Sequence, residues 1–284
     1  MKRLTLVLGA GGQLGQAMAA ELPARHEVVT LTRADVDVTS DAALTRAVTA
    51  VCPDIIINCA AFTAVDDAES EPTEALAVNA WSVRTLARIA ADLDATLVHY
   101  STDFVFDGET DRPYTEDDEP NPRSAYAASK LLGEWLAADA PRSYVLRVES
   151  LFGGPKTRSS VDRLLAGIRS GTSVRAFSDR TVSPSYVNDV VWATDRLIED
   201  DAPGGVYHCV NSGWATWADV AHELARLAGR PDADIVEVPA SAAGLIAPRP
   251  RFAALSNAKL AAAGIVMPAW QDALARHVAS SSAE

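Results

Sequence analysis

Two side chains four residues apart, Tyr126 and Lys130, could together carry out proton transfer. On a helix this spacing places a phenol and an ammonium group on one face. A tyrosine with an ordinary pKa near 10 is a poor proton donor at neutral pH, and a nearby cation favours the phenolate. At about 5 Å and an effective dielectric of about 20, Coulomb's law gives about 3 kcal/mol. We therefore expect Lys130 to lower the pKa of Tyr126 and to make the phenol a general acid.

The pair alone is a weak signal, because an exposed tyrosine and lysine often share a helix face by chance. Two segments upstream strengthen it. The stretch His99-Tyr100-Ser101-Thr102-Asp103 closes one apolar run, and Asn58-Cys59-Ala60-Ala61 closes another. Hydroxyl and small side chains at the carboxyl ends of parallel strands line the ligand crevice of open α/β sheets. We expect both segments to face such a crevice.

A glycine-rich turn, Gly9-Ala10-Gly11-Gly12-Gln13-Leu14-Gly15, directly follows the apolar run Leu4–Leu8 and precedes a helical pattern. Glycines at these positions allow a tight turn, a close approach of the backbone to a pyrophosphate, and close packing of helix on strand. The amides of the helix N-terminus then face the phosphate charge. Strand, turn and helix in this order predict a dinucleotide site that uses Gly9, Gly12 and Gly15.

The residues after the second apolar run bear on which dinucleotide binds. Many NAD-binding chains carry a carboxylate there for the adenosine ribose, whereas this chain has Leu31-Thr32-Arg33. An arginine can bind a 2′-phosphate through paired donors, so Arg33 favours NADPH over NADH, which remains possible. The alternative is an ordinary surface arginine at a strand end. Asp37 and Val38 could flank the adenine.

Apolar runs alternate with amphipathic ones over the first two thirds of the chain, which predicts a doubly wound parallel sheet of the Rossmann type. The expected strands are 4–8, 27–31, 54–59, 96–101, 143–148 and 206–210. The expected helices of this part are 13–21, 41–51, 73–93, 125–138 and 188–200.

The regular alternation of apolar and amphipathic segments weakens after Leu151, and we expect a smaller substrate-binding lobe there. Residues 1–150 would form the dinucleotide-binding domain, to which 184–211 would return, while 151–183 and 212–284 would form the lobe over the carboxyl edge of the sheet. The expected helices of the lobe are 159–169, 217–228, 257–263 and 270–279. An acidic, proline-containing segment over 107–123 is expected to be a surface loop.

The composition narrows the class of partner. The 284 residues are 48% hydrophobic and 22% charged, with a net charge of −13, which fits a globular protein and disfavours a nucleic-acid partner. No stretch approaches the roughly 20 apolar residues needed to span a bilayer. Three cysteines, Cys52, Cys59 and Cys209, lie inside or beside apolar segments, and we expect them to be buried free thiols in a reducing compartment. We expect a cytoplasmic enzyme whose partner is small, with no membrane association.

These motifs together resemble the extended short-chain dehydrogenase/reductase superfamily and, within it, the dTDP-4-dehydrorhamnose reductases. The glycine turn, the Asn-Ala-Ala-like segment and YxxxK define the superfamily only. The more specific blocks are NCAAFTAVDDAESEP and HYSTDFVFDG, and further matching segments extend along nearly the whole chain: GGQLGQ, YAASKLLGE, VYHCVNSGWATW and RPRFAALSNAKL.

The resemblance implies a reaction and roles for individual residues. Tyr126 would donate a proton at the C4 ketone of a nucleotide-linked deoxysugar, giving dTDP-L-rhamnose, while Lys130 would hold the nicotinamide ribose and Thr102 the substrate oxygen. Asp103, Thr63 and Val65 would touch the sugar. The cofactor, preferably NADPH, would be lined by Gly12, Gln13, Leu14, Ala60, Ala61 and Tyr100.

The chain also departs from that family. Where such reductases carry RTSWVYG, this chain reads Arg147-Val148-Glu149-Ser150-Leu151-Phe152-Gly153, so Ser150 replaces an aromatic wall and leaves the exact sugar open. Ala17 stands where some members carry a metal-binding glutamate, so we expect no metal. For the pyrophosphate of the nucleotide sugar we expect at least one of five basic residues to serve: Lys156, Arg158, Arg180, Arg249 and Arg251.

Two other functions share the scaffold. A nucleotide-sugar epimerase would retain its dinucleotide through each cycle, and a non-catalytic NADPH-binding regulatory subunit would have no need of Tyr126, Lys130 and Thr102 together. Dehydratases of the superfamily carry a glutamate where this chain has Phe104. A homodimer through the helices 73–93 and 125–138 is possible, although a buried face within one chain gives the same pattern.

Overall fold

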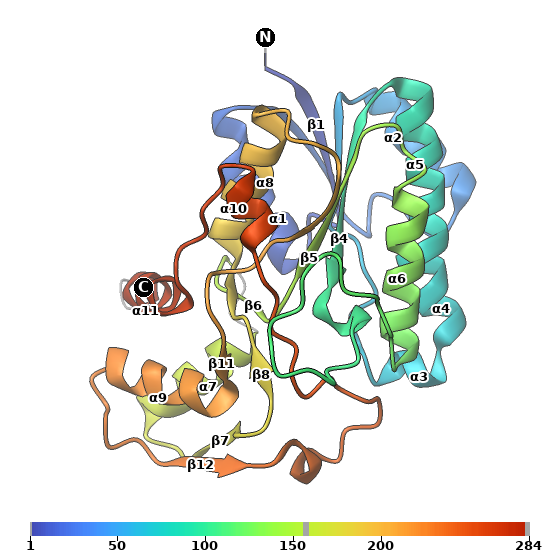
Figure 1. Ribbon diagram of the computed structural model, residues 1–284. Helices are drawn as coiled ribbons and strands as arrows, with labels where there is room; N and C mark the ends of the chain where they lie inside the picture. Colours follow the sequence, from blue (N-terminus) through green and yellow to red (C-terminus); the bar gives the residue numbers. More distant parts are fainter. Residues whose placement is uncertain (1, 156–158, 282–284) are drawn as a thin grey trace.

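The computed structural model describes residues 2–155 and 159–281, and a six-stranded parallel sheet runs through its centre (Figure 1). Its strands lie in the order β2-β1-β3-β4-β5-β10, and every neighbouring pair is parallel. Their bounds are β1 Leu4–Leu8, β2 Glu27–Leu31, β3 Ile55–Asn58, β4 Thr96–Thr102, β5 Ser143–Val148 and β10 Gly205–His208. The predicted doubly wound sheet is confirmed, and each predicted strand is present to within two residues at either end.

Helices cover both faces of this sheet because the strands are apolar on both sides. Val7 and Ile57 pack with α1 and α8 on one face, whereas Leu6 and Ile56 pack with α2 and α5 on the other. The helices are α1 Gln13–Glu21, α2 Asp41–Val51, α5 Ser82–Leu93, α6 Ala125–Ala137 and α8 Val187–Glu199, with the short helices η1 Leu22–Ala24 and α10 Ala258–Ala262 beside them.

The order of connections locates the crevice. The chain passes from β1 to β2 on one side and then returns past β1 to β3 on the other, so the strand order reverses between β1 and β3. Ligands bind outside the carboxyl ends of the strands at such a reversal. This edge of the sheet faces the lower part of the molecule in Figure 1.

The predicted helix 73–93 is instead three consecutive segments. They are α4 Pro72–Leu76, a π-helical turn η2 Ala77–Trp81, and α5, while α3 Asp67–Ser70 precedes them. Asn79, fully buried in the π turn, accepts a hydrogen bond from the Phe62 amide and donates to the Phe62 carbonyl and to Ser129 Oγ. The widened turn thereby ties the loop after β3 to α6, the helix that carries Tyr126.

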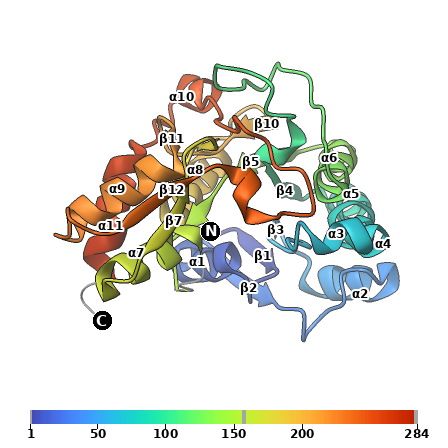
Figure 2. The ribbon, with the colours of Figure 1, turned by 90° about the horizontal axis from the view of Figure 1, so that it is seen from below.

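A second hydrophobic cluster lies beyond the carboxyl edge of the sheet, built around α7 Ser160–Ser170, α9 Trp217–Leu227 and α11 Trp270–Ser280. Figure 2, seen from below, shows these helices on one side of the sheet and α3 to α6 on the other. Short strands complete this part: β6 Leu151–Phe152, β7 Val174–Phe177, β8 Thr181–Val182, β9 Ser185–Tyr186, β11 Ala215–Thr216 and β12 Ile235–Val238, with the 3-10 helices η3 Asp103–Val105 and η4 Ala240–Ala243. No helix in the described ranges has the length and apolarity to cross a membrane.

Candidate active site

Two adjoining hollows open at the carboxyl edge of the sheet. The first, here the tyrosine hollow, has a volume of about 910 Å³ and contains Tyr126 and Lys130. The second, here the glycine hollow, has a volume of about 1150 Å³ and contains Gly9 and Arg33. Gly12, Cys59 and Ala61 line both, so the two form one continuous cleft.

The glycine turn is as tight as its sequence predicts. Gly9 has a φ of +73°, and a Cβ there would lie 2.5 Å from the Ala60 amide nitrogen. A Cβ on Gly15 would lie 2.3 Å from the Gly9 carbonyl oxygen. Gly12 is the N-cap residue of α1. Because glycine has no side chain that could bond the first amides of the helix, these amides stay open toward the cleft. Gly15 itself lines neither hollow, because its role is the packing of α1 against the turn.

The residues expected around the adenosine lie in the glycine hollow. Arg33, Asp37, Val38, Ala60 and Ala61 all line it. The Arg33 side chain is 97% exposed, and its guanidinium lies 3.9 Å from the Glu74 carboxylate. Asp37 accepts hydrogen bonds from the Thr39 amide and hydroxyl at 2.9 and 2.7 Å, and these bonds lower its pKa. Arg33 is thus the one cation among the described residues that line this hollow, and its side chain is open to solvent.

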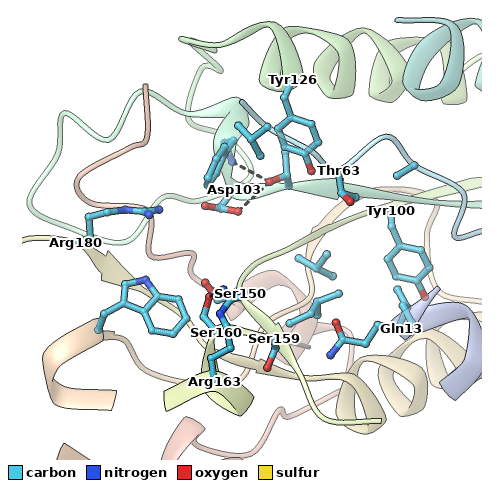
Figure 3. Close-up of a pocket in the computed structure, with 18 of the residues that line it drawn as sticks. Gln13, Thr63, Tyr100, Asp103, Tyr126, Ser150, Ser159, Ser160, Arg163 and Arg180 are labelled. Carbon is cyan, nitrogen blue, oxygen red and sulfur yellow. Dashed lines mark hydrogen bonds between the residues drawn. The ribbon is translucent and has the colours of Figure 1, made fainter. Parts of the chain in front are cut away.

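Tyr126 stands in the first turn of α6, which begins after the cap Ser124. Its hydroxyl points from the helix into the tyrosine hollow, toward Thr63 (Figure 3). Burial and the charge of Asp103 raise the pKa of Tyr126, while the Thr102 side chain acts in the opposite direction. The expected lowering of this pKa by Lys130 is therefore wrong for the structure, and the phenol stays protonated at neutral pH.

The position of Lys130 explains why the pKa of Tyr126 is not lowered as expected. Its Nζ donates to the Tyr100 carbonyl oxygen at 2.5 Å, at the end of β4, with the side chain almost wholly buried. Burial lowers the pKa of Lys130 to about 8, and the charge of Glu134, one turn further along α6, partly opposes this. Glu134 is itself paired with Arg147 at 2.7 Å and accepts from Ser101. The ammonium is thus held at the floor of the hollow, one helical turn from Tyr126.

The residues expected to touch the sugar line the same hollow. Thr63 and Val65 come from the loop after β3, and Thr102 and Asp103 from the end of β4. Thr102 Oγ1 donates to Asp103 Oδ1 at 2.9 Å and accepts from the Phe104 amide at 3.2 Å. Burial raises the pKa of Asp103 to about 7, although Thr102 and Arg180 act to lower it. Gln13, Leu14 and Tyr100 complete the predicted set.

Three of the five basic residues expected at the pyrophosphate lie in the described ranges, and only one of these three lines the cleft. Arg180 lines the tyrosine hollow, and in Figure 3 its guanidinium points toward Asp103. Arg249 pairs with Asp66 at 3.0 Å, and neither it nor Arg251 lines either hollow. Lys156 and Arg158 lie outside the described residues.

Sequence reasoning missed part of the wall that α7, β7 and α9 supply. Arg163, Arg175, Phe177 and Trp217 line the tyrosine hollow opposite Tyr126. No motif marks these residues, because the short strands that bring them together have no periodic signal. Ser150, which departs from the family pattern, lines the hollow with a φ of +46°.

One group of potential metal ligands lies away from the cleft within 2–155 and 159–281: His26, Asp195 and Glu199. The imidazole bonds Asp195 at 2.9 Å and Thr5 at 3.0 Å. Arg25 and Arg3 pair with the two carboxylates. Because these partners already satisfy the polar atoms, the group fastens β1 and β2 to α8.

The chain is similar to known proteins along nearly its whole length. A family model described as the RmlD substrate binding domain matches residues 1–282. The dTDP-4-dehydrorhamnose reductase of Streptomyces griseus is 36% identical over 95% of this chain and 91% of its own length, and that of Mycobacterium tuberculosis H37Rv is 35% identical over 97% and 92%. The crystal structure of the reductase from Bacillus anthracis in complex with NADP superposes with a TM-score of 0.93, at 29% identity, and covers 99% of this chain and all of that one.

The glycine turn, the parallel sheet and the buried tyrosine–lysine pair define a dinucleotide-dependent oxidoreductase of the short-chain dehydrogenase/reductase class. Within that class, the chain belongs to the dTDP-4-dehydrorhamnose reductase family. The resemblance drawn from the sequence is confirmed.

Proposed function

We propose that this chain uses NADPH to reduce the C4 ketone of dTDP-4-dehydro-L-rhamnose, giving dTDP-L-rhamnose. The observation that carries the proposal is the meeting of Tyr126, Lys130 and Thr102 in one hollow of a cleft whose two hollows join at the glycine turn. The names of the Streptomyces and Mycobacterium relatives support the same substrate.

The residues of the cleft fit a dinucleotide. The glycine turn brings bare backbone and the open amides of α1 to the point where the two hollows meet, which suits a pyrophosphate. Arg33 can reach a 2′-phosphate, because its side chain is nearly fully exposed on the rim of the glycine hollow. The NADP in the Bacillus anthracis reductase supports NADPH, with NADH possible as the weaker partner. When bound, NADPH supplies the hydride.

The chain itself handles the proton. Tyr126 is protonated at neutral pH because burial raises its pKa, so it can give its hydroxyl proton to the oxygen formed from the ketone. The Thr102 hydroxyl, which lines the same hollow as that phenol, can orient the substrate oxygen. Lys130 places a positive charge at the floor of the hollow, which stabilises negative charge that develops there.

For the nucleotide part of the substrate we propose the lobe of residues 151–183 and 212–284. Arg180, largely buried beside Asp103, is our choice for the pyrophosphate, with Arg163 and Arg175 on the same wall. Ser150 lines the hollow where the family resemblance implies an aromatic ring, and we propose that Thr63, Val65 and Asp103 hold the sugar instead.

The chain's assembly and location are further parts of the proposal. Trp81 and Trp135 are 42% and 63% exposed on η2 and α6, and such aromatic surface would suit contact with a second copy. All three cysteines are free, but Cys52 is exposed, so the expectation that all three are buried is wrong for that residue. Free thiols would suit a reducing cytoplasm. The net charge of −13 argues against a nucleic-acid partner.

The test is a coupled assay in which dTDP-4-dehydrorhamnose is generated in place and offered with NADPH or NADH separately. We expect dTDP-rhamnose to form with both and faster with NADPH. Absence of product with either coenzyme would contradict the proposal. Tightly retained NAD in the purified protein would instead favour an epimerase.

A further inference from the structure

Arg249 is expected from the sequence to meet a pyrophosphate, but it lines neither hollow of the cleft. Its side chain is 13% exposed, and its Nη1 lies 3.0 Å from Asp66 Oδ1. The same nitrogen donates to the Ala247 carbonyl oxygen at 2.8 Å. Its guanidinium carbon lies 5.9 Å from the centre of the Phe104 ring, within the range of a cation–π contact. Arg249 is therefore engaged with groups of the protein itself.

The segment that carries Arg249 joins distant parts of the chain beside the tyrosine hollow. Residues 245–252, here the strap, follow η4 and run from the side of β12 toward α3 (Figure 2). Near one end of the strap, the Ala247 amide donates to Asp66 Oδ1 in the loop after β3 at 2.8 Å. Near the other end, the Arg251 carbonyl oxygen accepts from the Thr181 amide of β8 at 2.8 Å. The strap is thus fastened at both ends.

Phe104 connects the strap to the proposed proton donor. Its ring lines the tyrosine hollow and packs edge-on against the Tyr126 ring, with 5.9 Å between the ring centroids and 87° between the ring planes. Both rings belong to one apolar cluster with Val65. Because edge-to-face pairs prefer a defined geometry, the direction of the Tyr126 ring depends on where the Phe104 ring lies.

The charges around the Phe104 ring explain why Asp66 is needed. The guanidinium carbon of Arg180 also lies 5.9 Å from the centre of this ring, and its Nε donates to the Pro250 carbonyl oxygen of the strap at 3.4 Å. Two like charges beside one ring repel each other. The Asp66 carboxylate supplies the negative charge that holds Arg249 in place. Without that carboxylate, we expect the Arg249 guanidinium to turn away from the ring and into solvent.

We propose that Arg249 and Asp66 are positioning residues, which hold Phe104 against Tyr126 and so direct the phenol hydroxyl toward the substrate oxygen. The inference rests on the proposed function, in which Tyr126 gives its proton to that oxygen. Neither Arg249 nor Asp66 lines either hollow, so both act through the Phe104 ring. A small misplacement of a reacting group costs much of its rate. Loss of either residue should therefore slow the reaction without weakening the binding of the sugar.

Two substitutions distinguish this role from binding of the pyrophosphate. Arg249→Met retains an unbranched side chain but has no charge. Asp66→Asn retains an oxygen that can accept from the Ala247 amide, but it cannot neutralise Arg249. Because a carboxylate would repel a pyrophosphate, a positioning role alone predicts that both substitutions have the same effect. Arg249→Lys, which can still pair with Asp66, should recover part of the lost rate.

Arg276→Met is the matched control, because Arg276 is held in the same way but away from the cleft. Its guanidinium pairs with the Asp189 carboxylate at 2.7 Å and lies 5.1 Å from the centre of the Tyr186 ring. None of these three residues lines either hollow. A general effect of removing a paired and stacked arginine would appear in this variant too. We expect its kcat and KM to equal those of the wild type.

The experiment measures kcat and KM for dTDP-4-dehydrorhamnose with saturating NADPH. We expect Arg249→Met and Asp66→Asn each to lower kcat about tenfold and to change KM less than about twofold. Because both act through one ring, the double variant should lose no more than the larger single loss. A KM raised about tenfold at unchanged kcat in Arg249→Met would assign this residue to the pyrophosphate and overturn the inference. Kinetics equal to those of the wild type would also overturn it, and both results would leave the proposed reductase function intact.

A second measurement needs no turnover. Fluorine NMR of the protein labelled with 3-fluorotyrosine reports the surroundings of each tyrosine ring, and the resonance of Tyr126 is identified by its loss in Tyr126→Phe. We expect Arg249→Met to shift that resonance, because the neighbouring Phe104 ring moves. Arg276→Met should shift the resonance of Tyr186 and leave that of Tyr126 in place. An unshifted Tyr126 resonance in Arg249→Met would overturn the inference even if the wild type reduced none of the sugars offered.

Discussion

Lys130 should destabilise the fold at neutral pH, and its replacement by methionine should make the protein more stable and inactive. The ammonium is almost wholly buried, and burial lowers its pKa from 10.5 to about 8. Each unit of difference between folded and unfolded chain corresponds to about 1.4 kcal/mol, so charging this group in the folded state costs about 3 kcal/mol. Methionine has a similar length and no charge.

Two contacts of Lys130 reduce the gain in the free energy of unfolding that is expected for Lys130→Met. Lys130→Met loses the hydrogen bond to the Tyr100 carbonyl, which offsets about 1 to 2 kcal/mol. Glu134 loses one neighbouring cation but keeps its pair with Arg147 at 2.7 Å. The net expectation at pH 7 is a free energy of unfolding about 1 to 2 kcal/mol above that of the wild type.

The sign of the pH dependence follows from linkage. Because the folded pKa lies below the unfolded one, the unfolded chain binds more protons between pH 8 and 10.5, and wild-type stability gains from this group as pH rises through that window. The advantage of Lys130→Met should therefore shrink above pH 8. Urea denaturation of both proteins at pH 7 and pH 9.5 measures this difference in the free energy of unfolding. A variant less stable than the wild type by 2 kcal/mol at pH 7 would refute the reasoning.

Two further predictions concern the coenzyme site. Arg33→Ser should weaken NADPH binding by about 10- to 100-fold, since a charge-assisted contact contributes about 1.5 to 3 kcal/mol, and it should leave NADH nearly unaffected; fluorescence titration with each coenzyme measures this, and equal losses for both would contradict it. Gly15→Ala should destabilise the protein by about 1 to 3 kcal/mol, because the new Cβ would lie 2.3 Å from the Gly9 carbonyl oxygen. Gly11→Ala is its control, since that Cβ meets only Thr32, at 3.9 Å; a thermal melt that ranked the two alike would count against this account of the turn.

The sheet and its helices were predictable because each strand is an apolar run and each helix an amphipathic one. The β1 strand Leu4–Leu8 and the helices Gln13–Glu21 and Asp41–Val51 match the expectation residue for residue. The segments beyond the sheet were harder to predict, because strands such as β8 and β11 are two residues long and form only by pairing with segments distant in the sequence. The π turn in the predicted helix 73–93 depends on Asn79 reaching Phe62, which local pattern does not reveal.

The position of the candidate residues was predictable, whereas their electrostatics were not. Tyr126, Lys130, Thr102 and Asp103 do meet in one hollow, as their places at strand ends and on one helix predict. Spacing along a helix could not tell that the Lys130 amine bonds the Tyr100 carbonyl, nor that Asp103 would raise the pKa of Tyr126. These depend on the direction of single side chains in a buried space.

The most direct test of the account is the rate of NADPH oxidation by Tyr126→Phe with saturating dTDP-4-dehydrorhamnose. Phenylalanine keeps the aromatic ring that packs edge-on against Phe104, with 5.9 Å between the ring centroids. Coenzyme binding and stability should therefore be nearly unchanged. We predict that kcat falls by about 10²- to 10⁴-fold, the usual contribution of a positioned general acid. A kcat within threefold of the wild type would contradict the claim that this phenol supplies the proton.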